Sequence, residues 1–350
     1  MTDKPIRAIV VGGTGYTGAE LVRLVLGHPS LELTAIVGNT TAGLPIAQAL
    51  PSLKGVMSGP VQPFDPDAIA RDADVAFCAL PHAASAEAVS ALRERDVPVL
   101  DLSADFRFDD LSVYEDWYGK HPTPDRLSEA VYGLVELHRD ELVGADLIAV
   151  PGCYPTAATL ALAPLVHGGL IKTDGIVVDA KSGVSGAGRG LSSGTHFPEA
   201  AEGVRAYKAG AHRHGPEIEQ ELSRLAGGAV RVAFVPHLVP MSRGILATCY
   251  AQPLAASLTA EACTEAARAL YAGSPSVHVL DTAEHPDTLW VRGSNRAHVA
   301  YTQEANSGII VAMSTIDNLV KGAAGQAIQC LNVRFGLEEG MGLEATAQWP

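Results

Sequence analysis

The chain has 350 residues, of which 47% are hydrophobic and 18% charged, and its formal net charge is −14 at pH 7. Such a chain can bury a core large enough for two domains, whereas its acidity disfavours nucleic acid as a partner. The five widely spaced cysteines include no CxxC pair, which argues against a disulfide framework and a metal site and favours a reducing cytoplasm. No targeting segment or membrane-spanning apolar run is evident, so no membrane partner is expected.

Apolar strands and helical patterns alternate in the first part of the chain. Strand-like runs cover residues 6–11, 31–37, 75–80 and 97–102. A helical pattern follows the first run and stops at His28-Pro29, and another occupies 84–95. This alternation predicts a doubly wound, Rossmann-type parallel sheet that helices cover on both faces.

A glycine cluster between the first strand and the first helix matches the pattern G-x-G-x-x-G. Glycines in that position permit a tight turn and the close approach of a pyrophosphate to backbone N–H groups. We therefore expect a dinucleotide site here. Its expected members are Gly12, Thr14, Gly15, Tyr16, Thr17 and Gly18. The segment Leu80-Pro81-His82, after the third strand, either lies over the cofactor or forms a simple turn.

The second strand ends without the acidic residue that holds the ribose 2′-hydroxyl in NAD-binding sites. Asn39, Thr40 and Thr41 stand there instead and can donate hydrogen bonds. An acidic side chain would repel a 2′-phosphate, so its absence favours NADP(H). No arginine reinforces this preference.

The pattern changes in the second half of the chain. Longer alternating or β-branched runs occur at 176–180, 230–235, 245–250 and 309–313, with few βα repeats between them. They predict a second, α+β domain with a mixed, more antiparallel sheet. A Gly/Ser-rich stretch at 182–194 is typical of an active-site loop, and residues 318–331 have the apolar spacing of one helix face.

Cys153 lies in the turn Pro151-Gly152-Cys153-Tyr154-Pro155-Thr156, between an apolar run at 147–150 and a helical run at 157–166. A thiol near a helix start has a lowered pKa and more reactive thiolate, so Cys153 is a candidate nucleophile. The alternative is a buried structural cysteine. Beside a nicotinamide, a nucleophilic cysteine suggests thioester chemistry, in which an acyl group is transferred to sulfur and then reduced by hydride.

His212 and His214 supply a candidate proton-handling group just before a predicted helix that has Pro216 in its first turn. The positive end of a helix disfavours imidazolium, so a histidine there stays neutral and accepts a proton. Two solvated histidines that cap a helix are the alternative.

Together these motifs resemble the N-acetyl-γ-glutamyl-phosphate reductase family of the semialdehyde dehydrogenase superfamily. The matching segments, which stand in order over nearly the whole chain, are residues 15–21, 79–82, 101–107, 151–156, 181–189, 212–217, 236–238 and 241–244. The resemblance implies NADPH-dependent reduction of N-acetyl-γ-glutamyl phosphate to the semialdehyde with release of inorganic phosphate, in arginine biosynthesis. It also implies an NADP-binding domain of residues 1–152 that is completed by the C-terminal helix 318–350, and a catalytic and oligomerisation domain of residues 153–317. It further implies a homo-oligomer, either a dimer or a tetramer.

The resemblance assigns roles to individual residues. Cys153 becomes the acyl-accepting nucleophile, His214 the first choice for acid/base work, and His212 the residue that positions substrate. The implied substrate-binding residues are Arg107, Arg243, Ser185 and Glu217, and the implied further cofactor-binding residues are Ser182, Gly183 and Asn318. The two arginines suit a carboxylate and a phosphate, which guanidinium binds bidentately.

Three rival interpretations stay open. Aspartate-semialdehyde dehydrogenase shares the chemistry but usually has Asn before the nucleophile, where this chain has Gly152. A lysine-pathway N-acetyl-aminoadipyl-phosphate reductase differs by one methylene in its substrate, which changes binding by only about 1–3 kcal/mol. A non-catalytic NADP-binding sensor is the alternative of another class, and it would not need Cys153 in this turn.

Overall fold

The computed structural model describes residues 4–349, which form two compact units. The first contains the chain up to Pro151 together with Ala323–Glu344, and the second contains Gly152–Gly322 together with the residues from Ala345 onward. The returning segment is thus shorter at both ends than the predicted 318–350. At its far end the backbone N–H of Gln348 donates to the Arg292 carbonyl at 2.8 Å, which ties the last residues to the second unit.

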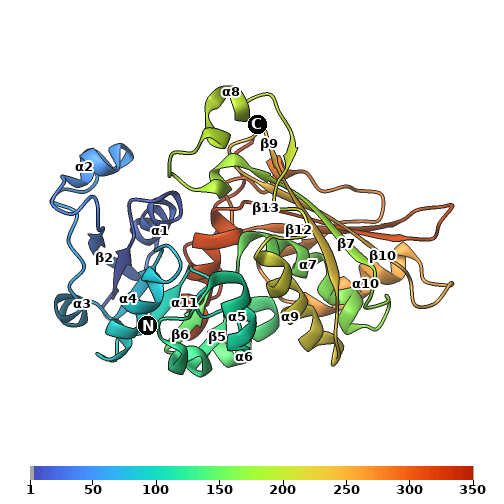
Figure 1. Ribbon diagram of the computed structural model, residues 1–350, viewed down its shortest axis with the longest axis horizontal. Coiled ribbons are helices and arrows are strands. Elements are labelled where there is room, and N and C mark those ends of the chain that lie inside the picture. The colour runs from blue at the N-terminus through green and yellow to red at the C-terminus, as the bar shows by residue number, and fades with distance from the viewer. Residues whose placement is uncertain (1–3, 350) are drawn as a thin grey trace. The chain divides into compact units, whose positions relative to one another are not determined.

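The first unit contains a six-stranded sheet in the order β2-β1-β3-β4-β6-β5 (Figure 1). Its strands are β1 (Ile6–Val11), β2 (Leu31–Val37), β3 (Val75–Cys78), β4 (Val99–Asp101), β5 (Ala130–Tyr132) and β6 (Leu147–Ala149). Every pair in it is parallel. The prediction of a Rossmann-type parallel sheet is therefore confirmed.

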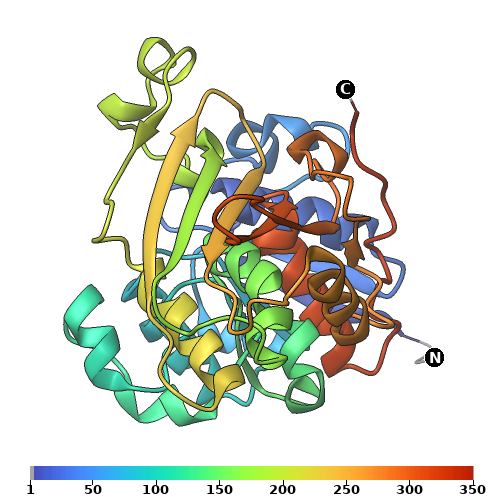
Figure 2. The same cartoon turned by 90° about the vertical axis from the view of Figure 1, so that its right-hand side faces the viewer.

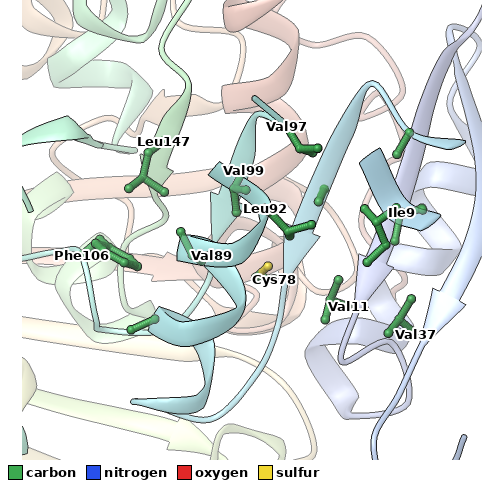
Figure 3. Close-up of a cluster of buried hydrophobic side chains, with 14 of the residues drawn as sticks. Ile9, Val11, Val37, Cys78, Val89, Leu92, Val97, Val99, Phe106 and Leu147 are labelled. Carbon is green, nitrogen blue, oxygen red and sulfur yellow. The ribbon is translucent and has the colours of Figure 1, made fainter. Parts of the chain in front are cut away.

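Helices cover the sheet of the first unit. They are α1 (Tyr16–Gly27), α2 (Ile46–Ala49), α3 (Pro66–Asp72), α4 (Ala84–Arg93), α5 (Leu111–Tyr118), α6 (Val135–Leu142) and α11 (Gly325–Arg334). Helix α11 packs against α1 and α6, while α3 packs against α4. Figure 3 shows Val89 and Leu92 of α4 in the buried cluster with Ile9, Val99 and Leu147 of three strands. Helices lie on the sheet, so most residues of these strands are apolar and buried.

The second unit contains a seven-stranded sheet in the order β11-β12-β13-β10-β7-β9-β8. Its strands are β7 (Ile176–Gly183), β8 (Arg205–Ala206), β9 (Val232–Val239), β10 (Ile245–Ala251), β11 (Val277–Val279), β12 (Ala297–Gln303) and β13 (Ile310–Ile316). The pairs β7–β9 and β11–β12 are parallel, whereas the other pairs are antiparallel. This is the mixed sheet that the second-half pattern predicts.

Three helices of the second unit pack against this sheet: α7 (Cys153–His167), α9 (His214–Ala226) and α10 (Ala260–Leu270). Along β7, Val178 and Ala180 are buried, whereas Asp179 and Lys181 on the other face are half-exposed. We call that second face the open face of the sheet. A segment that includes α8 (Phe197–Ala200) projects beyond the strands, as Figure 2 shows in yellow-green.

Two helices differ from their predicted ranges: one begins earlier than predicted, and the other is interrupted. Helix α7 begins at Cys153 itself, not at residue 157, because Pro155 stands in the first turn, where a missing N–H does no harm. The predicted helix 318–331 is interrupted: a π-helical turn, Val320–Ala324, precedes α11. Short 3-10 turns occupy η1 (Pro51–Leu53), η2 (Pro124–Glu129), η3 (Val184–Ala187), η4 (Ser193–Thr195) and η5 (Thr288–Trp290). Within residues 4–349, no helix combines the length and apolarity needed to cross a membrane.

Candidate functional site

The glycine cluster forms the turn between β1 and α1. Gly12 has a φ of +80°, which favours glycine, and a Cβ on it would collide with the Ala79 carbonyl oxygen. A Cβ on Gly18 would lie against the Gly12 carbonyl oxygen, while Gly15 borders nearly open space. Tyr16 begins α1, whose first-turn N–H groups have no intrahelical partners. The missing side chains leave the cradle that a pyrophosphate fills, so the residues present fit a dinucleotide.

The end of β2 faces this turn. The Thr14 and Thr41 hydroxyls lie 3.2 Å apart, which ties the glycine cluster to the segment after β2. Asn39 and Thr40 are exposed, and a Cβ on Gly38 would meet the Thr41 side chain. The polar groups here carry no negative charge, which suits a 2′-phosphate.

The segment after β3 lies beside the glycine cluster. The Ala79 N–H donates to the Val11 carbonyl at 2.8 Å, at the carboxyl end of β1. Leu80 is half-buried, and Pro81 and His82 are exposed. The structure therefore brings these predicted cofactor residues to the same end of the parallel sheet as the glycine turn.

Cys153 is half-buried and is the first residue of α7. Gly152 precedes it in an extended conformation, and the Gly152 N–H donates to Glu217 Oε1 at 2.8 Å. The Gly152 carbonyl accepts hydrogen bonds from the Thr156 N–H at 2.9 Å and from the Thr156 hydroxyl at 3.0 Å. The thiol thus lies at the N-terminus of a 15-residue helix, where the peptide dipoles favour a negative charge.

Glu217, which the resemblance assigned to substrate, is fully buried on α9. Its bond to the Gly152 N–H places its carboxylate behind the nucleophile's turn. In this arrangement Glu217 fixes the backbone that carries Cys153.

Gly322 lies against the nucleophile. A Cβ built on Gly322 would be 2.8 Å from Cys153 Cβ and 3.2 Å from Ile316 Cδ1. The Gly322 N–H donates to the Asp317 carbonyl at 2.9 Å within the π-helical turn. Such turns occur often at functional sites. The sequence did not single out Gly322, because nothing in a Lys-Gly-Ala-Ala segment indicates which residue meets a cysteine far away in the chain.

His212 and His214 lie together around Tyr154. Their ring centroids are 4.7 Å apart, and each is within 5.9 Å of the Tyr154 ring. His214 is the first residue of α9, so the helix includes it and has Pro216 in its first turn as predicted, and the His214 N–H donates to His212 Nδ1 at 3.1 Å. Burial, followed by the charges of Lys208 and Arg213, lowers the pKa of His212 to about 4. His212 is therefore neutral, with its proton on Nε2 while Nδ1 accepts.

Tyr207 completes the ring cluster and was not singled out from the sequence. Its hydroxyl donates to the Tyr154 hydroxyl at 3.1 Å, and the Tyr154 hydroxyl donates to the His237 carbonyl at 3.1 Å. Burial raises the pKa of Tyr207 to about 12, and the charge of Cys153 acts in the same direction. Both tyrosines are neutral at physiological pH, so they contribute shape and hydrogen bonds near the thiol.

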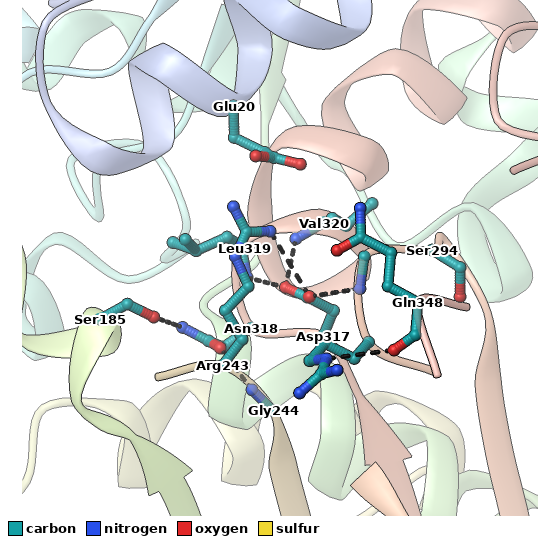
Figure 4. Close-up of polar contacts among 12 residues, drawn as sticks. Glu20, Ser185, Arg243, Gly244, Ser294, Asp317, Asn318, Leu319, Val320 and Gln348 are labelled. Atoms are coloured by element: carbon teal, nitrogen blue, oxygen red, sulfur yellow. Dashed lines mark hydrogen bonds and ion pairs between the residues drawn. The ribbon is translucent and has the colours of Figure 1, made fainter. Parts of the chain in front are cut away.

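The Gly/Ser-rich loop meets Asn318, as Figure 4 shows. Asn318 Nδ2 donates to Ser185 Oγ at 2.9 Å, and Asn318 Oδ1 accepts from the Gly244 N–H at 2.8 Å. A Cβ on Gly183 would be 2.7 Å from the Ser242 carbonyl oxygen, and Ser182 is buried. The structure therefore brings Ser185, Gly183 and Asn318 together in the second unit.

Arg243 lies beside these residues, with its guanidinium 3.5 Å from Asp317 Oδ2 (Figure 4). Asp317 is fully buried and also accepts from the N–H groups of Gly293, Leu319 and Val320. The Arg243 side chain is partly exposed, and its ion pair with the buried Asp317 carboxylate holds the guanidinium in place.

Arg107 lies among backbone carbonyls of the first unit. It is buried and donates to the carbonyls of Val150 and Leu102, each at 2.8 Å. These contacts join the carboxyl ends of β4 and β6. Arg107 therefore stabilises the ends of these strands, and its contact with substrate stays a prediction.

Within residues 4–349, no cluster of three or more His, Cys, Asp or Glu side chains is arranged to hold a metal ion.

Two family models match this chain. The semialdehyde dehydrogenase NAD binding domain matches residues 7–145, and the semialdehyde dehydrogenase dimerisation domain matches residues 153–318. The N-acetyl-gamma-glutamyl-phosphate reductase of Rhodopirellula baltica is 46% identical over 98% of this chain and 99% of its own. That of Heliobacterium modesticaldum is 47% identical over 99% of this chain and all of its own.

Solved structures show the same fold at low sequence identity. Aspartate semialdehyde dehydrogenase II from Vibrio cholerae, complexed with ASA, has a TM-score of 0.71 at 16% identity and covers 95% of this chain and 98% of its own. Aspartate semialdehyde dehydrogenase from Candida albicans, solved with NADP, has a TM-score of 0.64 at 17% identity, with 94% and 98% covered. These likenesses establish the architecture of both units.

Proposed function

We propose that this chain, which belongs to the N-acetyl-gamma-glutamyl-phosphate reductase family, reduces N-acetyl-γ-glutamyl phosphate to N-acetylglutamate semialdehyde with NADPH, in arginine biosynthesis. The observation that carries the proposal is Cys153 at the start of α7, with His214 and the neutral His212 packed on the adjacent Tyr154. A sensor without catalytic function would not need this arrangement.

In the first step the Cys153 thiolate attacks the acyl carbon, and the bond from that carbon to the phosphate oxygen breaks. His214 holds the proton that left the thiol when the thiolate formed and gives it to the departing inorganic phosphate, while the acyl group stays on Cys153 as a thioester. His212, held neutral by burial, donates from Nε2 to a substrate oxygen. Arg243 binds the substrate's carboxylate or phosphate.

The dinucleotide is held by the glycine turn before α1, by Thr40 after β2 and by the 80–82 segment after β3. NADPH held there would supply the hydride that reduces the thioester, and Cys153 would be left as a free thiolate when the carbon–sulfur bond breaks and the aldehyde departs. Ser182, Gly183, Ser185 and Asn318 are proposed to surround the reacting groups. The bonds from Asn318 to Ser185 and Gly244 support a fixed geometry there.

We also infer self-association through the open face of the second unit's sheet, because the dimerisation-domain match covers this unit. Val177, Asp179 and Lys181 present a mixed apolar and charged row on that face. The assembly is a dimer or a tetramer built from such dimers. Val177→Glu should lower the molar mass measured by light scattering, whereas Val143→Glu, on an exposed site of the first unit, should not.

A cytoplasmic location accords with chemistry that needs NADPH and a free thiol.

The test is the reverse reaction. Purified enzyme should form NADPH from NADP and N-acetylglutamate semialdehyde only when inorganic phosphate is present. Aspartate semialdehyde and the N-acetylated homologue one methylene longer serve as competing substrates, and higher kcat/KM for either would reassign the substrate. A folded enzyme that forms no NADPH with any of the three would contradict the proposal.

A further inference from the structure

The loop after β3 contains a backbone outlier. Ala83 has φ +67° and ψ −49°, a region that L-residues other than glycine rarely enter. Ala83 follows Pro81 and His82 and precedes α4 directly. A strained residue persists only when its surroundings hold it.

Asp105 is what holds it. This side chain is fully buried, and its carboxylate accepts from the Ala83 N–H at 2.8 and 3.1 Å and from the Ala86 N–H at 2.9 Å. The buried Tyr114 hydroxyl donates to Asp105 Oδ1 at 2.9 Å. Ala83 has no polar side chain to cap α4, so Asp105 supplies the cap from 22 residues away. A negative charge there is also favoured by the helix dipole.

A second bond ties the same two segments together. The Ala104 N–H donates to His82 Nδ1 at 3.0 Å. Three backbone N–H groups therefore join the two segments: those of Ala83 and Ala86 donate to Asp105, and that of Ala104 donates to His82. These contacts fix both the direction of the loop and the ring of His82.

The loop lies where a parallel sheet binds its ligand. The order β2-β1-β3 places the switch point of the sheet between β1 and β3, and ligands bind there outside the carboxyl ends of the strands. The glycine turn follows β1 and the Asp105-held loop follows β3, with Gly12 against the Ala79 carbonyl. The two loops therefore lie next to each other at the carboxyl end of the sheet.

We propose that Asp105 is a positioning residue for the dinucleotide: its carboxylate holds Ala83 in a strained conformation that presents Pro81 and His82 to the bound cofactor. Asp105 itself does not touch the cofactor. The inference rests on the proposed NADPH site in the first unit.

The test measures the dissociation constant of NADPH by fluorescence on apoenzyme. Asp105→Asn replaces one acceptor by an NH₂ group that faces backbone N–H groups, and we expect affinity to fall by about tenfold. Asp65→Asn is the matched control, since Asp65 also caps a helix, α3, but at an exposed site. The control should bind NADPH like the wild type. The rate at which iodoacetamide alkylates Cys153 should not change in either variant.

Substitutions at the exposed Ala83 test the same inference, and Ala83→Val does so even if Asp105→Asn does not fold. Ala83→Gly in the Asp105→Asn background should restore NADPH affinity by about threefold or more, because glycine adopts this conformation without strain. Ala83→Val alone should weaken NADPH binding, because a β-branched residue disfavours it. Unchanged affinity in Asp105→Asn or in Ala83→Val would overturn the inference. Wild-type enzyme that binds no NADPH would instead refute the proposed function.

Discussion

Glu217 Oε1 accepts a hydrogen bond from the Gly152 N–H at 2.8 Å, so a buried carboxylate on α9 fixes the residue that precedes the nucleophile. The two residues are 65 positions apart in the chain. The contact links the helix that begins with His214 to the helix that begins with Cys153. It holds the first turns of these two helices to each other.

Glu217→Gln should leave stability nearly unchanged, because an amide oxygen still accepts from the Gly152 N–H. Glu217→Ala leaves that N–H unpaired and should lower the free energy of unfolding by about 1–3 kcal/mol. Urea denaturation measures both variants. Equal stability of Glu217→Ala and the wild type would show that the contact contributes nothing.

Gly322→Ala should slow both turnover and alkylation of Cys153 by iodoacetamide, because the new methyl group would be 2.8 Å from Cys153 Cβ. We expect a loss of roughly tenfold or more, since small displacements of a reacting group have large effects on rate. Gly27→Ala is the control, since nothing lies within 4 Å of a Cβ there. If Gly322→Ala reacted like Gly27→Ala, the close approach would have no catalytic consequence.

Substitution of His214 and substitution of His212 should affect different kinetic constants, kcat and KM respectively. His214→Asn should lower kcat by roughly 10²–10⁴ with little change in KM, because proton transfer assists only the transition state. His212→Asn should mainly raise KM. Rate loss confined to His212→Asn would reverse the assignment, and if neither variant lost rate, His237 would be the next candidate.

The pH dependence of stability gives a second measurement for His212. Its folded-state pKa, about 4, lies below the value of an exposed histidine, so the unfolded chain binds more protons between these values. The stability that neutral His212 provides is therefore complete above the unfolded pKa of about 6.5 and is lost as the pH falls toward 4. His212→Asn should flatten this part of the unfolding curve, which urea titrations at several pH values would detect.

The cofactor preference should depend on the uncharged segment after β2. We expect a higher kcat/KM with NADPH than with NADH, and Thr40→Asp should erode the difference by repelling the 2′-phosphate. Steady-state kinetics with both cofactors checks this. Equal use of NADH and NADPH by the unmodified enzyme would refute it.

Sequence reasoning located the first unit's early strands to the residue. The predicted runs 6–11 and 31–37 coincide with β1 and β2, because each run is mainly apolar and ends directly before a glycine. In the second unit β7 and β9 extend beyond the predicted ends, through Lys181 and His237. Lys181 and His237 lie on the open face of the sheet. Because they are polar, the apolar run in the sequence stops before them although the strand continues.

The details of the candidate site depended on contacts that no local pattern encodes. The π-helical turn at Val320–Ala324 keeps the apolar spacing of an ordinary helix, so the break was not predictable. Glu217 was expected at the substrate and Arg107 at an anion, yet both donate or accept within the protein's own backbone. The motifs identified which residues matter, but only long-range packing shows what each of them touches.

The central claim is that Cys153 carries the acyl group. Enzyme mixed with N-acetyl-γ-glutamyl phosphate in the absence of any dinucleotide should release inorganic phosphate once per active site and gain the mass of the N-acetylglutamyl group, located on Cys153 by peptide mapping. NADPH added afterwards should remove the adduct and release the semialdehyde. Cys153→Ser should show no such adduct. A wild-type enzyme that turns over with NADPH but forms no adduct on Cys153, or a Cys153→Ser variant that keeps its activity, would contradict the account.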